Sequence, residues 1–167
     1  MKEYTTEFIR NIAMASHSNA GKTMLAEAFL HFTGATTRLG KIEDGTTVGD
    51  FEEEEIRRGI SLSTSVIPVE YKGYKINLLD TPGYTDFVGE VISALRVADS
   101  AAILVDSVSG AEVGTEIALN YCDQFGLPRM VIINKMNRDN ANFNKALDTV
   151  KQITDKRLLP VQLPWGE

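Results

Sequence analysis

Cysteine is almost absent from this sequence, in which Cys122 is the only one among 167 residues. An intramolecular disulfide is therefore impossible, and such sparing use of cysteine is typical of a reducing compartment. The sequence also lacks an apolar run long enough to cross a bilayer, and its first residues do not resemble a secretory signal. These absences predict a protein of the cytoplasm without a membrane contact.

Basic residues are also in short supply, because 17 Lys and Arg stand against 23 Asp and Glu, a formal net charge of -6. A protein that binds nucleic acid without regard to sequence needs a basic face, so this balance argues against that class. We likewise expect no direct sequence-specific contact with nucleic acid. Docking to a ribonucleoprotein through one loop stays possible. The length and a hydrophobic content of 43% suit one domain with a real core.

Apolar patterns alternate along the chain between strand-like and helix-like periods. They predict helices near 22–32, 88–95, 113–125 and 143–153, and strands near 8–14, 63–71, 74–79, 101–105 and 130–133. This alternation predicts an α/β fold with a mostly parallel sheet, helices on both faces, and a ligand at the carboxyl ends of the strands. Residues 33–60 form a long polar connection, which is normally functional or mobile. We expect its acidic run, 52–55, to be a solvated surface.

A phosphate-binding loop is predicted directly after the first strand. The segment matches the G-x-x-x-x-G-K-[ST] pattern except that Ser16 replaces its first glycine. Lys22 can reach the β- and γ-phosphates, the Thr23 hydroxyl can bind Mg²⁺, and successive N–H groups can bind phosphate oxygens. An ordinary glycine turn before a helix is the alternative. The candidate loop residues are Ser16, His17, Ser18, Asn19, Ala20, Gly21, Lys22 and Thr23.

Two further polar segments follow predicted buried strands in the order expected of a GTP-binding domain. In the first, Asp80-Thr81-Pro82-Gly83, the Asp80 carboxylate can hold Mg²⁺ and the Gly83 N–H can sense a γ-phosphate. In the second, Asn134-Lys135-Met136-Asn137, Asn134 can bridge the base to the phosphate loop, and the Lys135 stem can cover the purine. The alternatives are an Asx-Pro turn and a polar turn after a strand. On the long connection, Ser61 is a candidate second hydroxyl ligand of Mg²⁺.

These residues together resemble the GTP-binding domain of bacterial elongation factor G and its paralogues among the translational GTPases. The resemblance covers nearly the whole chain and includes 16–23, 58–61, 80–83, 86–91, 105–113 and 134–136. It implies a P-loop GTPase that binds GTP and GDP with Mg²⁺ and hydrolyses GTP on the ribosome. The parent protein would thereby drive translocation or a related elongation or recycling step. The implied catalytic residues are Tyr84, Lys22 and Gly83.

The resemblance is broken at several positions that would face the ligand. Tyr84 stands where the family usually has a histidine that orients the attacking water, and a phenol offers no imidazolium. Some elongation-factor-G paralogues carry tyrosine here, so we expect slower or differently triggered hydrolysis. Asn19 replaces an aspartate of the family's loop and removes a negative charge beside the phosphates. Ser61 replaces threonine, but its hydroxyl survives.

Asn137 replaces the aspartate of the family's N-K-x-D segment. A carboxylate offers two acceptors to the N1–H and the exocyclic amine of guanine. An amide offers one acceptor and one donor, so one of these guanine donors faces the amide N–H. An unpaired buried group of this kind costs roughly 1–3 kcal/mol, so we expect weaker selectivity for guanine and a relative gain for xanthine nucleotides.

We expect residues 1–159 to form an incomplete P-loop GTP-binding domain, without its last strand and helix, in a fragment that is a monomer. Residues 160–167 then begin the segment that leads to an inserted subdomain, and the ribosome is engaged through the full-length protein. One rival interpretation is a regulatory module that binds a nucleotide or the ribosome with little or no hydrolysis. Another is a P-loop NTPase outside translation, which would not explain the segments 58–62 and 86–91.

Overall fold

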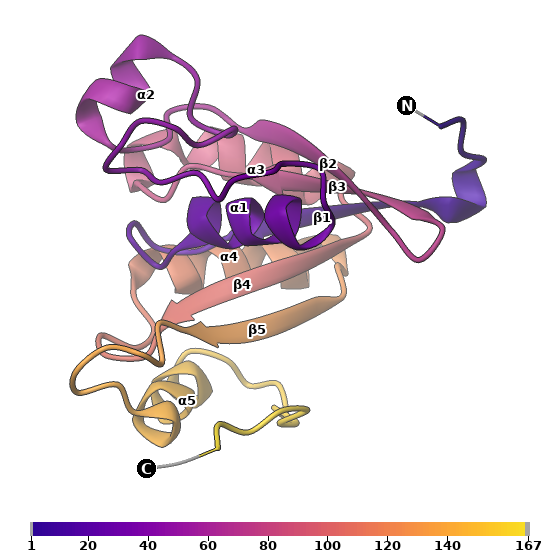
Figure 1. Ribbon diagram of the computed structural model, residues 1–167. Helices are drawn as coiled ribbons and strands as arrows, with labels where there is room; N and C mark the ends of the chain where they lie inside the picture. The colour runs from indigo at the N-terminus through magenta and orange to yellow at the C-terminus, as the bar shows by residue number, and fades with distance from the viewer. Residues whose placement is uncertain (1, 166–167) are drawn as a thin grey trace.

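Five strands form one mostly parallel sheet in the computed structural model, which describes residues 2–165 (Figure 1). The strands are β1 (Ile9–Ala15), β2 (Ser65–Tyr71), β3 (Tyr74–Asp80), β4 (Ser100–Asp106) and β5 (Arg129–Asn134). Their order across the sheet is β2-β3-β1-β4-β5, and only β2 runs antiparallel to its neighbour. Lys72 and Gly73 join β2 to β3 with positive φ at both residues, as a tight hairpin turn requires. The predicted α/β class is confirmed.

Helices cover both faces of this sheet (Figure 1). They are α1 (Lys22–Phe32), α2 (Glu53–Arg58), α3 (Val88–Val97), α4 (Val113–Phe125) and α5 (Phe143–Gln152), with short 3₁₀ turns η1 (Thr6–Phe8) and η2 (Thr85–Phe87). Helix α1 packs on one face, and α3, α4 and α5 pack on the other. The sequence patterns predicted four of these helices. The short α2 was missed because it lies in a polar connection without an apolar stripe.

Two apolar cores lie on opposite faces because side chains alternate along each strand. On β4, Ile103 and Val105 face the core formed with α3, α4 and α5, whereas Leu104 faces the core formed with α1. All three are at most 1% exposed, so β4 is buried on both faces. A continuous apolar run on a central parallel strand follows from this double burial.

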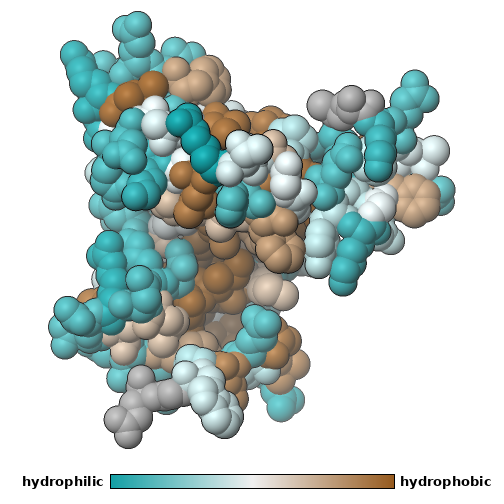
Figure 2. Space-filling model, viewed as in Figure 1, coloured by the Kyte–Doolittle hydropathy of each residue, from teal (hydrophilic) through white to brown (hydrophobic). Residues whose placement is uncertain are grey.

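Within the described part of the chain, no helix covers a portion of the sheet face that carries α1. Strands β4 and β5 lie open on this face, and a hollow over them is lined with apolar side chains (Figures 1 and 2). Ala102 and Ile132 are only partly buried there, and Met130 is 55% exposed. Strand β5 is also an edge strand, so one row of its backbone groups faces outwards.

The topology places a ligand crevice at the carboxyl end of β1. Both β3 and β4 lie parallel beside β1, and the chain leaves β1 towards one side and β4 towards the other. Open α/β sheets bind ligands outside the strand ends at such a switch point. The candidate residues after β1, β3 and β5 therefore meet at one edge of the sheet. Within residues 2–165, no helix is both long and apolar enough to cross a membrane.

The thiol of Cys122 offers a probe of this packing. It is fully buried in the core beside α3 and α5, and burial raises the pKa of Cys122 to about 11. Because the thiolate is the reactive form, we expect almost no reaction with a disulfide reagent at pH 8 in native buffer and complete reaction in denaturant. Rapid labelling of the native protein would contradict this packing.

Candidate functional site

The loop between β1 and α1 curls around the first turn of α1. Asn19 and Gly21 both have left-handed backbone angles, with φ of 61° and 97°. A Cβ on Gly21 would lie 2.6 Å from Asn134 Nδ2, so only glycine fits beside the end of β5. Gly21 is also the residue before α1, and it has no side chain with which to cap the helix. The N–H groups of the first turn therefore stay available to an anion.

Lys22 lies inside this loop and is only 6% exposed. Its Nζ donates to Ser16 Oγ over 2.9 Å and to the His17 carbonyl over 3.4 Å. Burial lowers the pKa of Lys22, and the nearby carboxylates of Asp80 and Asp50 oppose that effect. An ammonium held in a ring of backbone and hydroxyl groups is suited to bind phosphate oxygens.

The predicted magnesium ligands come together at the start of α1. Thr23 Oγ1 lies 3.4 Å from Ser61 Oγ, although 38 residues separate them. Asp80, at the end of β3, is 1% exposed, and its Oδ1 has no hydrogen-bond partner among residues 2–165. Burial raises the pKa of Asp80, while the charge of Lys22 opposes the rise. A buried carboxylate oxygen without a partner beside two hydroxyls fits a hard divalent cation.

Carboxylates alone do not make this a metal site. Among residues 2–165, no group of three His, Cys, Asp or Glu has a metal-binding arrangement. Mg²⁺ commonly takes one or two protein oxygens and completes its shell with water and substrate phosphates. Thr23, Ser61 and Asp80 offer three oxygens, and a cation held by them would take its remaining ligands from water or phosphate.

Buried carboxylates fix the long connection over the site. Glu27, on the buried face of α1, accepts the N–H groups of Gly40 (3.0 Å) and Val48 (2.5 Å). Glu55, on α2, accepts those of Leu62 (2.9 Å) and Ser63 (3.3 Å). The expectation that 52–55 is a solvated surface is wrong at Glu55, which is 1% exposed because it holds the segment after Ser61.

Asp50 is a residue of the site that sequence reasoning missed. It is 5% exposed, and its Oδ1 accepts the Ser61 hydroxyl over 2.6 Å. No spacing rule marks a single aspartate in a polar loop. Glu27 did carry a signal, because it shares the buried stripe of α1 with Thr23 and Leu30, where a carboxylate needs partners.

Gly83 approaches the phosphate loop so closely that no side chain fits. A Cβ there would lie 2.6 Å from Ser18 Cα and 2.7 Å from Lys22 Nζ. The Thr81 hydroxyl donates to the Met14 carbonyl over 2.8 Å and holds the start of this segment against β1. The predicted 80–83 segment thus lies against the predicted 16–23 loop.

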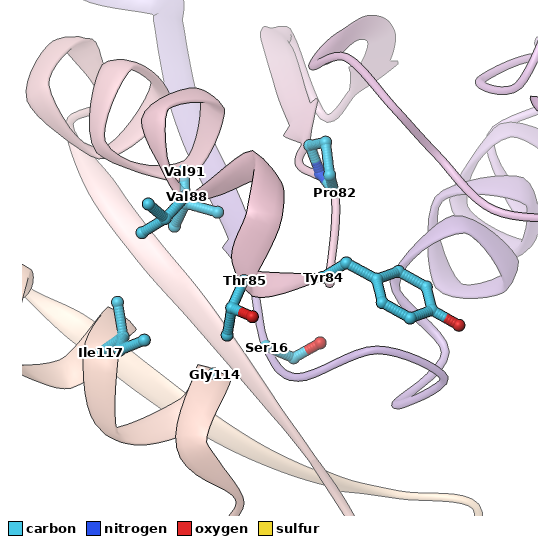
Figure 3. A pocket seen from close by; sticks show the side chains of 9 residues that line it. Ser16, Pro82, Tyr84, Thr85, Val88, Val91, Gly114 and Ile117 are labelled. Atoms are coloured by element: carbon cyan, nitrogen blue, oxygen red, sulfur yellow. The ribbon is translucent and has the colours of Figure 1, made fainter.

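Tyr84 follows at the surface and is 39% exposed. Figure 3 shows its ring pointing away from a small cavity between η2, α3 and α4, which is lined by Val88, Val91 and Ile117 among others. That cavity admits the centre of a water molecule within about 10 Å³, which is room for a single water. The phenol therefore faces the outer side of the site and not the cavity.

The end of β5 is joined to the phosphate loop. Asn134 Nδ2 donates to the Ala20 carbonyl over 2.9 Å, and Lys135 Nζ donates to the Asn19 carbonyl. Lys135 also pairs with Asp106 at 3.0 Å, a partner that the sequence did not reveal. Met136 and Asn137 are exposed in the turn beyond. The structure thus brings Asn134 and Lys135 against the loop and leaves Met136 and Asn137 at the rim.

The first turn of α4 supports the loop from behind. Gly114 donates its N–H to His17 Nδ1 over 3.3 Å, and His17 Nε2 lies 3.7 Å from Glu112 Oε1. A Cβ on Gly114 would lie 2.7 Å from His17 Cα. His17 is therefore wedged against α4, which fixes the backbone of the loop.

The family described as Elongation factor Tu GTP binding domain matches residues 7–162. This match covers nearly all of the elements described above. The chain belongs to this family. Its site geometry agrees with that membership, because the three predicted segments lie together at the ends of β1, β3 and β5.

Relatives support the same assignment. Elongation factor G of Granulibacter bethesdensis is 39% identical over 99% of this chain, which spans 24% of that protein. The mitochondrial ribosome-releasing factor 2 of Rattus norvegicus is 40% identical over 95% of the chain, which spans 20% of it. The chain thus covers about a quarter or less of these relatives. The predicted resemblance to elongation factor G is confirmed.

Solved structures share the fold. A crystal structure of a protein from Thermus thermophilus covers 87% of this chain with a TM-score of 0.83 and 39% identity, and the match spans 22% of that protein. Translation elongation factor SelB from Methanococcus maripaludis, in complex with the GTP analogue GPPNHP, covers 86% with a TM-score of 0.63. At 22% identity, with 25% of its own length matched, SelB supports the fold alone.

The close approach of Gly83 predicts a sharp effect of one methyl group. Gly83→Ala would drive a Cβ into the Ser18 backbone and the Lys22 ammonium, so we expect GDP affinity, measured by titration calorimetry, to fall by about tenfold or more. Gly89→Ala on α3 is the matched control, because a Cβ there meets nothing within 4 Å. Equal affinities of the two variants would contradict the close approach.

Proposed function

We propose that this chain is the GTP-binding domain of an elongation-factor-G-like translational GTPase. The observation that carries the proposal is that Lys22, Gly83 and the unpartnered Asp80 oxygen lie together at the carboxyl ends of β1 and β3. In the parent protein the domain would bind GTP or GDP with Mg²⁺ and hydrolyse GTP on the ribosome, which would drive translocation or a related elongation or recycling step. The relatives named elongation factor G and ribosome-releasing factor 2 support this role.

The proposed residue roles follow the contacts. Loop residues 16–23 bind the phosphates, with the ammonium supplied by Lys22. Thr23, Ser61 and Asp80 hold Mg²⁺, which when bound neutralises charge on the phosphates. The N–H of Gly83 donates to the γ-phosphate. The neighbours Thr81 and Pro82 set the path of that segment against β1.

The base would lie between the ends of β4 and β5. The side chains of Asn134 and Lys135 donate hydrogen bonds to backbone carbonyls of the phosphate loop, so they can position the base relative to the phosphates. Met136 and Asn137 are exposed beside them and complete the proposed base contact.

We assign to Tyr84 the role of orienting the water molecule that attacks the γ-phosphate. Its exposed phenol follows Gly83 directly, so it lies at the γ-phosphate side of the site. A phenol orients water by hydrogen bonding, because its hydroxyl can both donate and accept.

The proposed domain comprises residues 1–159, with 160–167 as the start of the segment towards an inserted subdomain. Residues 159–165 are exposed and without helix or strand, and residues 166–167 lie outside the described part. The uncovered apolar face of β4 and β5 supports a domain that lacks its last strand and helix. We further propose that the fragment is a monomer and that the parent protein is cytoplasmic.

A second candidate function is nucleotide or ribosome binding with little hydrolysis. The observation in its favour is Tyr84, which lacks the imidazole of the family's usual histidine. Asn19 and Asn137 add to it, because both remove a carboxylate from the ligand side.

Nucleotide titration tests the proposed function directly. We expect this chain to bind GDP in the presence of Mg²⁺, and we expect Asn137→Asp to bind it about 10-fold or more tightly, with selectivity over xanthosine diphosphate restored. Calorimetry with GDP, GTP and xanthosine diphosphate measures both quantities. Equal GDP affinities of the two proteins would show that Asn137 does not weaken guanine recognition, and absence of binding would count against the function.

Single-turnover GTP hydrolysis in the full-length protein separates the two candidate functions. We expect ribosomes to stimulate hydrolysis, and we expect Tyr84→His to raise the stimulated rate because an imidazole can orient and accept from water. Tyr84→Phe, which keeps the ring and removes the hydroxyl, is the matched control and should be slower. No stimulation in the native protein, together with a gain in Tyr84→His, would favour the module with little hydrolysis.

A further inference from the structure

Ser16 occupies the position at which the phosphate-loop pattern has its first glycine. It is 3% exposed and lies at the end of β1, where its Oγ makes two hydrogen bonds. The hydroxyl donates to the His17 carbonyl over 2.7 Å, and it accepts from Lys22 Nζ over 2.9 Å. Neither contact is available to glycine or alanine.

The Ser16 hydroxyl is the nearest hydrogen-bond partner of the Lys22 ammonium. The His17 carbonyl is farther away at 3.4 Å, and no carboxylate forms an ion pair with Lys22 among residues 2–165. A buried ammonium needs such an acceptor, because charge without a partner is costly. The hydroxyl proton is directed to His17, so a lone pair of Oγ is left for Lys22.

The backbone that carries Ser16 is held independently of this hydroxyl. Gly114 donates to His17 Nδ1, and the close packing of Gly114 leaves no room for the loop to move towards α4. Removal of the Ser16 hydroxyl should therefore leave the loop in place and change only the partner of Lys22.

We propose that Ser16 sets the nucleotide affinity of this site by competing with phosphate oxygens for the Lys22 ammonium. The inference rests on the proposed function, in which Lys22 binds the phosphates. The ammonium has three N–H donors, and the Ser16 hydroxyl and the His17 carbonyl accept two of them. Phosphate oxygens that accept more than one of these donors must therefore displace Ser16 or His17, and the Ser16 hydroxyl accepts from the ammonium again when the phosphate leaves. The hydroxyl thereby weakens binding and speeds release.

The test compares this chain with Ser16→Ala and with Ser16→Cys, whose thiol has a similar size and is a weak acceptor. Stopped-flow fluorescence with a fluorescent GDP analogue measures affinity and release. We expect both variants to bind about tenfold more tightly and to release more slowly, because a hydrogen bond to a charged group is lost from the competing state. Ser93→Ala removes an exposed hydroxyl on α3 and is the control, with unchanged affinity expected. Equal or weaker binding by Ser16→Ala would overturn the proposal.

Two further measurements separate this inference from the proposed function. NMR of the Lys22 side-chain nitrogen, without nucleotide, should show a changed shift in Ser16→Ala and no change in Ser93→Ala; an unchanged Lys22 signal in Ser16→Ala refutes the contact. Pyrophosphate titration tests the phosphate competition without a base. Tighter pyrophosphate binding by Ser16→Ala, without preference for guanine nucleotides, supports the role of Ser16 and refutes the guanine-nucleotide function. Absence of pyrophosphate binding in every variant overturns the competition.

Discussion

Burial of four carboxyl groups beside the site, two of them near the Lys22 ammonium, is the constraint on which this structure depends. Glu27, Asp50, Glu55 and Asp80 are each at most 5% exposed, and Lys22 is the one buried basic side chain among residues 2–165. Each acid needs partners, because an unsatisfied buried charge is expensive. Three find them in the connection from 33 to 64, while one Asp80 oxygen stays unpaired. Hydrogen bonds to these carboxylates therefore hold the connection over the site, and the Asp80 Oδ1 atom stays available to a ligand.

The fold was predictable because it rests on local patterns. Helix α1 was predicted with its observed bounds, and the apolar runs located β4 and β5. Helix α2 and the role of Glu55 were not predictable, because a short acidic segment without an apolar stripe looks solvated until its hydrogen bonds to Leu62 and Ser63 are known. Asp106 was missed because its ion pair with Lys135 joins segments far apart in sequence. Asp50 was missed because no spacing rule marks a single aspartate that contacts Ser61 within the same polar connection. A motif at a strand end can be recognised from neighbouring residues in the sequence. A carboxylate that fixes a loop can be recognised only from its hydrogen-bond partners in the fold.

Contacts from three directions make the phosphate loop rigid. Asn134 and Lys135 hold it from β5, Gly114 supports it from α4, and Gly83 lies against it from the β3 side. A movement of any of these elements must therefore change the loop or break a close contact. Rigidity of this kind is what preorganised recognition of phosphate oxygens requires. It also gives the long connection a fixed surface on which to place Ser61.

The departures from the family pattern include one glycine position, which Ser16 occupies, while Gly21 and Gly83 of the pattern are present. Gly21, Gly83 and Gly114 lie where a Cβ would be within 2.7 Å of a neighbouring atom, so the packing admits no substitution. Tyr84 and Asn137 are exposed, and their exchange alters what a ligand meets without disturbing a core. Ser16 is the exception, since it is buried, yet its hydroxyl is satisfied on both sides by the loop itself. Backbone geometry is thus fixed by steric exclusion, and the polar chemistry facing the ligand is left free to diverge.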